Sequence, residues 1–189
     1  MKGNTRYIQI LSLAALIQPI VADAHPLHWS GESIGILSGL AHPITSSDHI
    51  LTMLAVGLWI GQTSRRTIYL MSLIFVTLML IGGGLTLIPV EITYAENVMY
   101  ISALLVGLMM VSGYKVSSLI SVSIVGNLAL FHGYVHAYDI WLDIDAISYT
   151  VGFALATVAL ITVGIAIRSL IDRSKYKNIT CFLDGISGR

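Results

Sequence analysis

Long apolar stretches run through this chain, and charged side chains interrupt them at few points. Four stretches contain no Asp, Glu, Lys or Arg: 67–90, 97–114, 116–138 and 146–167. A helix needs about 20 apolar residues to cross a bilayer, and each stretch is close to that length. The pattern predicts four transmembrane helices joined by short connections, so that neighbouring helices run antiparallel and pack together.

An earlier apolar stretch, Gly31 to Gln62, is interrupted by the polar segment His42-Pro43-Ile44-Thr45-Ser46-Ser47-Asp48-His49. Residues 31–41 would form about 16 Å of helix, which is too short to span. Pro43 disfavours helical geometry at the residue before it. We expect a short helix near 31–41, a break at 42–47 and a second helix near 48–62, which together cross once. A helical hairpin with two full crossings is the alternative.

Before this segment, the first 24 residues are typical of a secretory signal peptide. Lys2 and Arg6 precede an apolar segment, and Ala22-Asp23-Ala24 fits an A-x-A cleavage site. Cleavage would make His25 the first residue of the mature chain, and an uncleaved signal anchor is the alternative. At the other end, residues 172–189 are polar and are expected to form a mobile cytoplasmic tail.

Composition agrees with an all-α, polytopic membrane bundle. Of 189 residues 56% are hydrophobic and 11% charged, whereas a soluble domain carries about 25% charged residues. Zero net charge argues against nucleic-acid binding, and a single cysteine argues against a disulfide framework. We expect one helical domain, residues 25–171, with helices near 31–41, 48–62, 67–88, 97–114, 116–138 and 146–170.

The loop charges predict the orientation of the bundle. If His25 lies outside and the chain crosses the membrane once before Arg65, all the later basic residues lie on the same, inner side. They are Arg65, Arg66, Lys115, Arg168, Arg173, Lys175, Lys177 and Arg189. The opposite loops hold only acidic residues: Glu32, Glu91, Glu96, Asp139, Asp143 and Asp145. The positive-inside rule then predicts an extracytoplasmic mature N-terminus and a cytoplasmic C-terminus.

All six histidines fall into three groups: His25/His28, His42/His49 and His132/His136. Between Ser33 and Ser64 the only charged residue is Asp48, and an ionisable group at membrane depth is a functional-site candidate. Imidazole-rich ligand sets suit Ni, Co, Cu, Zn or Fe(II), whereas Mg and Ca prefer all-oxygen shells.

His132 and His136 stand four residues apart, so they share one helix face and could chelate one ion. Asp139 could be a further ligand or could orient an imidazole. Gly133, between them, would let another helix approach. If the signal is removed, His25 offers both its α-amine and its imidazole, with His28 nearby. Imidazole must be neutral to bind metal, so capture should weaken below about pH 6.5.

Each of these groups also has a purely structural interpretation. The two histidines of the second motif could hydrogen bond between helices, and His25 could belong to a solvated stub. Asp48 could cap the second helix, since Asp is a favoured N-cap. Met53, four residues after His49, could offer a thioether, although packing is the favoured interpretation.

Two motifs in order behind a signal ending in Ala-His-Pro make the chain resemble the HupE/UreJ proteins. The first is His-Pro-x-x-x-x-Asp-His, followed by Met53 and Val56-Gly57, and the second is Phe131-His132-Gly133-Tyr134-x-His136. The resemblance implies a nickel or cobalt permease of a bacterial inner membrane. It also implies metal-handling roles for His25, His42, Asp48, His49, His132 and His136. Ser46, Ala137 and Asp139 stand where the family usually has Gly, Gly and Glu.

Our first functional hypothesis is therefore a permease for Ni²⁺ or Co²⁺ that is not an enzyme and needs no organic cofactor. Its expected partners are the metal ion and the lipid bilayer, with a homo-oligomer as a possibility and no nucleic acid. The main alternative is an intramembrane zinc-dependent hydrolase, in which histidines, an Asp and nearby serines would hold a catalytic Zn²⁺. A third is a metal-sensing or structural partner subunit that does not transport.

Overall fold

The computed structural model describes residues 35–88, 91–112, 117–141 and 145–187, and these residues form helices and turns without strands. The expected all-α fold is confirmed. Three helical segments are long and apolar enough to cross a membrane: α4, Leu119–Ala137 of α6 and Ala146–Ser174 of α7. The helices are α2 (Ile36–Thr45), α3 (Ser47–Ile60), α4 (Arg65–Leu85), α5 (Ala95–Ser112), α6 (Ser118–Trp141) and α7 (Ala146–Ser187).

Helices α2 and α3 form the expected broken helix, but the break is narrower than the sequence indicated. Only Ser46, with φ −86° and ψ 119°, leaves the helical conformation. His42 and Pro43 lie inside α2, because the fixed φ of proline is compatible with a helix even though its ring removes one donor. The helix then continues to Thr45, whose hydroxyl donates to the carbonyl of Ala41 at 2.9 Å.

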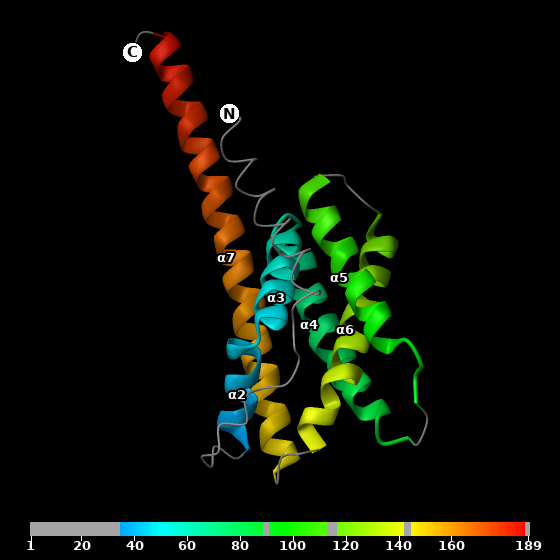
Figure 1. Cartoon of the computed structure of the whole chain (residues 1–189). Helices are drawn as coiled ribbons and strands as arrows, with labels where there is room; N and C mark the ends of the chain where they lie inside the picture. Colours follow the sequence, from blue (N-terminus) through cyan, green and yellow to red (C-terminus); the bar gives the residue numbers. More distant parts are fainter. Residues whose placement is uncertain (1–34, 89–90, 113–116, 142–144, 188–189) are drawn as a thin grey trace.

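The alternative of two full crossings is contradicted. At 1.5 Å per residue, α2 and α3 are about 15 Å and 21 Å long, less than the roughly 30 Å of a hydrocarbon core. They also run in the same direction, one after the other along α7 (Figure 1). Together they make one passage through the bundle. The first expected residues of this helix, 31–34, lie outside the described residues.

Helix α7 extends beyond the expected end at residue 170 and reaches Ser187. The helix therefore includes most of the segment that was expected to be a mobile tail. No Pro or Gly occurs between Arg173 and Asp184 to end it. Near its expected end, Arg168 Nε donates to Asp172 Oδ2 at 2.9 Å, an i, i+4 pair that favours continuation.

Two helix groups make up the bundle. Helices α2 and α3 pack mainly along α7, whereas α4 and α5 pack mainly along α6, and contacts between the two groups are sparser. Close glycine contacts hold the first group together. A Cβ at Gly39 would overlap the Tyr149 carbonyl oxygen, and a Cβ at Gly57 would overlap that of Ile161. We call these groups the α7 unit and the α6 unit.

Close glycine contacts also hold the α6 unit together. A Cβ at Gly133 would overlap the carbonyl oxygen of Met79 on α4, and a Cβ at Gly82 would overlap that of Leu130 on α6. The expectation that Gly133 lets another helix approach is therefore confirmed. Because Gly133 lies between His132 and His136, the contact with α4 fixes the position of the helix segment that carries both imidazoles.

The two ends of the bundle differ in charge. Glu91, Glu96 and Asp145 lie at the end where α4 and α6 finish and α7 begins (Figure 1). Arg65 and Arg66 lie at the other end, where α3 finishes and α4 begins. We call these the acidic end and the basic end.

Candidate metal-binding site

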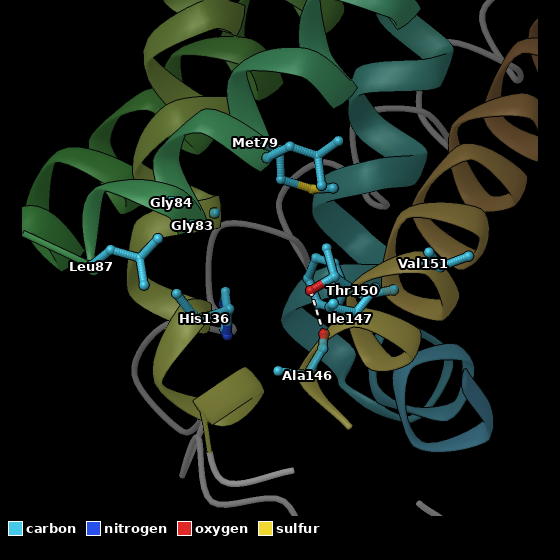
Figure 2. Close-up of a pocket in the computed structure, with 13 residues that line it drawn as sticks. Met79, Gly83, Gly84, Leu87, His136, Ala146, Ile147, Thr150 and Val151 are labelled. Atoms are coloured by element: carbon cyan, nitrogen blue, oxygen red, sulfur yellow. Dashed lines mark hydrogen bonds between the residues drawn. The ribbon is translucent and has the colours of Figure 1, made fainter. Parts of the chain in front are cut away.

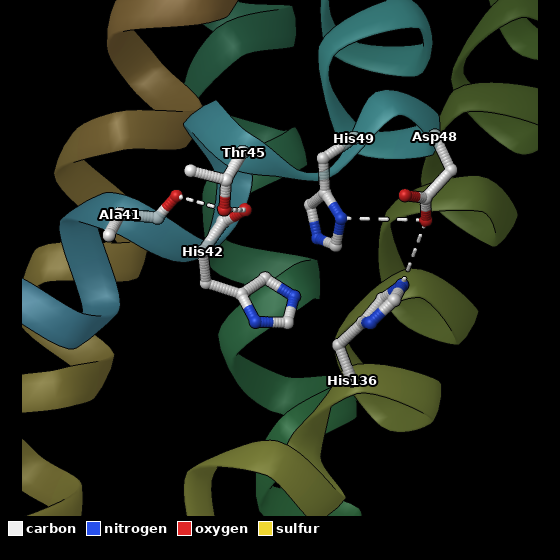
Figure 3. Close-up of polar contacts among 6 residues, drawn as sticks. All are labelled: Ala41, His42, Thr45, Asp48, His49 and His136. Atoms are coloured by element: carbon white, nitrogen blue, oxygen red, sulfur yellow. Dashed lines mark hydrogen bonds and ion pairs between the residues drawn. The ribbon is translucent and has the colours of Figure 1, made fainter. Parts of the chain in front are cut away.

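Four histidines from three helices gather inside the bundle, and His49 of α3 lies at their centre. Its ring centroid is 4.9 Å from that of His42, 4.3 Å from His132 and 4.2 Å from His136. One nitrogen each of His42, His49 and His136 lies within 4.8 Å of the others. Figure 3 shows these three rings pointing toward one another from α2, α3 and α6. We call the four residues the imidazole cluster.

Asp48 places a carboxylate beside this cluster. Its Oδ2 lies 3.5 Å from Nδ1 of His49 and 3.7 Å from Nε2 of His136 (Figure 3). Neighbours on a regular helix point about 100° apart, yet Asp48 and His49 both face His136 because they occupy the first turn of α3. The N-cap of α3 is Ser46, so the interpretation of Asp48 as the cap is wrong.

The deepest two imidazoles are buried without hydrogen bonds. His49 is fully buried and His132 is 1% exposed, and the ring nitrogens of both lack a hydrogen-bond partner among the residues that the structure describes. The structural interpretation, in which His132 and His136 hydrogen bond between helices, is therefore not supported for His132. Buried polar groups are nearly always hydrogen bonded. Buried ring nitrogens without hydrogen-bond partners are available as ligands for a metal ion.

A cavity of about 360 Å³ borders the imidazole cluster at His136. Its walls come from α4, α6 and α7 and are mainly apolar, and His136 projects from one of them (Figure 2). Leu87 and Ile147, near the acidic end, also line the cavity and are exposed. His136 is therefore the residue of the imidazole cluster that this cavity exposes.

At the start of α7, next to this cavity, Asp145 carries a stable negative charge. Its Oδ1 accepts a hydrogen bond of 3.1 Å from the backbone N–H of Ser148. Hydrogen bonds from Ser148 lower the pKa of this exposed carboxyl below its ordinary value. Asp145 is therefore ionised at neutral pH and adds to the acidic charge at this end.

Two aromatic residues of α7 complete the surroundings and were missed in the sequence. The ring centroid of Phe153 lies 5.6 Å from His42 and 5.3 Å from His49, and that of Tyr149 lies 6.3 Å from His42. Phe153 also lines the cavity. Their i, i+4 spacing on either side of Gly152 was the available signal, because it places both rings on one face beside a close helix contact.

The structure thus brings together five of the six candidate site residues: His42, Asp48, His49, His132 and His136. His25 and its neighbour His28 lie outside the described residues, as does the side chain of Asp139. Met53 is fully buried in the hydrophobic core, as expected for a packing residue.

Comparisons with known proteins agree on one family. The profile of the family described as HupE / UreJ protein matches residues 13–187 of this chain. Protein HupE of Rhizobium leguminosarum bv. viciae is 35% identical over 160 residues, which cover 84% of this chain and 82% of that protein. No solved structure gives a significant match.

Proposed function

The chain belongs to the HupE/UreJ family and is a membrane protein, and from these premises we propose that it is a permease for a divalent transition-metal ion, Ni²⁺ or Co²⁺. One observation carries the proposal. Two separate parts of the chain, the α2–α3 break and α6, bring four buried imidazoles and a half-buried carboxylate together. This donor set suits Ni²⁺ and Co²⁺, whereas Mg²⁺ and Ca²⁺ prefer oxygen ligands.

In this proposal the ion is the cargo, and it enters from the acidic end. Negative charge at Glu91, Glu96 and Asp145 raises the local concentration of cations. The ion then passes through the cavity to His136, the member of the cluster that lines it. His42 and His49, with Asp48 beside them, replace the water that the ion loses. His25 collects ions at the outer face, as the sequence suggests.

Transport requires a ligand set that binds the ion and also lets it go. Imidazoles from different helices meet this requirement, because a small displacement of one helix removes a ligand. An inside-negative membrane potential drives the ion inward. It is worth about 2.3 kcal/mol per charge per 100 mV, and thus about 4.6 kcal/mol for a divalent cation.

We place the protein in a bacterial inner membrane, with the acidic end extracytoplasmic and the C-terminus cytoplasmic. The charge difference between the two ends supports this orientation. Its partners in the proposal are the metal ion and the lipid bilayer. No feature of the described helices or of the matched relative favours the intramembrane hydrolase.

The test is uptake by purified protein in liposomes with an inside-negative potential and a Ni²⁺-sensitive dye inside. We expect Ni²⁺ and Co²⁺ uptake by the wild type and none by His49→Ala, because His49 is the ring that touches all the others. Asn127→Ala is the matched control, since Asn127 is an exposed polar residue of α6 whose amide bonds the Ser123 carbonyl. Equal uptake by wild type and His49→Ala would contradict the site.

A further inference from the structure

Phe153 of α7 borders both the cavity and two of the buried imidazoles. Its side chain is 3% exposed, and it lines the cavity together with His136. His42 and His49 are not among the residues that line the cavity, but their ring centroids lie 5.6 Å and 5.3 Å from that of Phe153. The proposed path of the ion leads from His136 to these two rings, so an ion on this path passes beside Phe153.

Close contacts between α2 and α7 fix the backbone that carries this ring. A Cβ at Gly152 would overlap the carbonyl oxygen of Ile36 on α2. A Cβ at Gly39, also on α2, would lie only 2.9 Å from the backbone nitrogen of Phe153. The two helices are therefore in backbone contact where Phe153 begins, and α2 also carries His42. The phenyl ring and this imidazole are thus held in a fixed relation to each other.

Neighbouring rings pack against Phe153 from its own helix and from α3. Tyr149, one turn earlier on α7, is 5% exposed, and its ring lies nearly parallel to that of Phe153, at 18° with the centroids 6.4 Å apart. The ring of His49 on α3 is nearly perpendicular to that of Phe153, at 89°. Aromatic pairs favour such an edge-to-face arrangement. Phe153 is therefore a firmly held apolar wall beside the imidazoles.

A phenyl ring offers a divalent ion no oxygen, nitrogen or sulfur ligand. It also occupies space that water would otherwise fill. An ion beside Phe153 must therefore exchange water molecules for imidazole nitrogens. Imidazole ligands compensate Ni²⁺ and Co²⁺ for the water they lose, whereas Mg²⁺ prefers oxygen ligands and usually keeps several of its waters.

We propose that Phe153 determines which divalent ions reach His42 and His49, because its ring excludes the water that Mg²⁺ would have to retain. The inference rests on the proposed permease function, and it assigns selectivity against Mg²⁺ to a residue that binds no metal. The apolar surroundings of a metal site control the access of solvent to it. Without the ring, water would fill the space beside the two imidazoles, and Mg²⁺ would pass with part of its hydration shell.

The first test measures selectivity in liposomes with an inside-negative potential. Uptake rates of Ni²⁺ and of Mg²⁺ are measured separately, each with a dye for that ion inside. We expect the ratio of the Ni²⁺ rate to the Mg²⁺ rate to fall about tenfold in Phe153→Ala, mainly through faster Mg²⁺ uptake. Phe153→Leu keeps an apolar wall and should retain the wild-type ratio. Phe153→Val, a smaller truncation, should lower the ratio by a smaller factor, and it replaces Phe153→Ala if that variant does not fold.

Ile161→Ala is the matched control on the same helix. Ile161 lies two turns beyond Phe153, is 1% exposed and belongs to the hydrophobic core, but it is not among the residues that line the cavity. Its truncation should lower stability and leave the ratio of the two uptake rates at the wild-type value. If Ile161→Ala lowered this ratio as much as Phe153→Ala, general loosening of the bundle would be the cause and the proposal would be overturned.

The second test reports on the water around the bound ion and requires no transport. Purified protein in detergent is saturated with Co²⁺, whose visible absorption is strong in four-coordinate sites and weak in six-coordinate sites that include water. We expect strong bands from the wild type and from Phe153→Leu, and clearly weaker bands from Phe153→Ala. Equal band intensities in wild type and Phe153→Ala would overturn the proposal.

The outcomes also separate this inference from the permease proposal. If wild type and Phe153→Ala show the same ratio of Ni²⁺ to Mg²⁺ uptake while His49→Ala takes up no Ni²⁺, the role of Phe153 is wrong and the permease stands. If the wild type itself takes up neither Ni²⁺ nor Co²⁺, the permease proposal fails and the selectivity inference fails with it.

Discussion

Among single residues, Asp48 has a role that no imidazole can replace. Neutral imidazoles supply ligand atoms but no negative charge, whereas Asp48 supplies charge to rings on two helices, His49 on α3 and His136 on α6. Its side chain is 24% exposed, and it lies at the edge of the buried rings. In the proposed permease, Asp48 would thus offset part of the charge of a divalent cation.

Asp48→Asn should therefore weaken metal binding without unfolding the protein. The amide keeps the shape of the carboxylate but loses its charge, and changes in groups that support metal ligands typically cost 10- to 100-fold in affinity. We expect a loss of about that size for Ni²⁺, measured by isothermal titration calorimetry in detergent. Asp172→Asn removes a carboxylate paired with Arg168 far from the cluster and should leave the affinity unchanged. Equal affinities in both variants would argue against a role for Asp48.

The site residues differ in how far the sequence could predict them. His42, Asp48, His49, His132 and His136 could be predicted, because an ionisable side chain inside an apolar membrane segment is costly and therefore indicates a function. Tyr149 and Phe153 were missed, because the i, i+4 spacing of two aromatic rings on α7 points to the site only when the facing helices α2 and α3 are known.

Within single elements, glycines set how closely the helices approach. Gly133 faces the Met79 carbonyl of α4 and lies between the two imidazoles of α6. A methyl group there must push α4 and α6 apart. The displacement would reach both His132 and His136, because each is within one turn of Gly133.

Gly133→Ala should consequently destabilise the protein and disturb the site together. Overpacking typically costs 1–3 kcal/mol, so we expect about 2 kcal/mol less free energy of unfolding and weaker Ni²⁺ binding. Thermal unfolding in detergent and calorimetry measure the two effects. Gly84→Ala is the control on α4, because a Cβ there meets nothing within 4 Å. It should leave stability unchanged or raise it by up to about 1 kcal/mol. If Gly133→Ala and Gly84→Ala were equally stable, the close contact at Gly133 would not constrain the packing of α4 against α6.

Helix positions could be predicted from the apolar stretches, but some helix ends could not. The rule that helices end before proline placed the break too early, since α2 continues through Pro43 while it packs on α7 at Gly39. Polarity likewise suggested that the helix would end near residue 170, although α7 continues to Ser187. For α2 the local rule omits the partner helix, and packing against α7 outweighs it. For α7 the polarity of the residues was not enough to end a helix that contains no Pro or Gly between Arg173 and Asp184.

For the whole molecule, the contrast between acidic and basic ends predicts one orientation in the membrane. We expect a membrane-impermeant maleimide to label Thr93→Cys but not Ser64→Cys in intact cells, each made with Cys181→Ser. Both positions are exposed, one at the acidic end and one at the basic end. Permeabilised cells provide the control, because both variants should then react. Labelling of Ser64→Cys alone in intact cells would reverse the orientation.

The division of the bundle into an α7 unit and an α6 unit has a consequence for how an ion could be released. His42, Asp48 and His49 belong to the first unit, whereas His132 and His136 belong to the second, and the glycine contacts described above lie within units and not between them. A rocking of one rigid half against the other would therefore dismantle the coordination shell without changing a single rotamer. Alternating access in this fold would need only the sparsely packed boundary to yield.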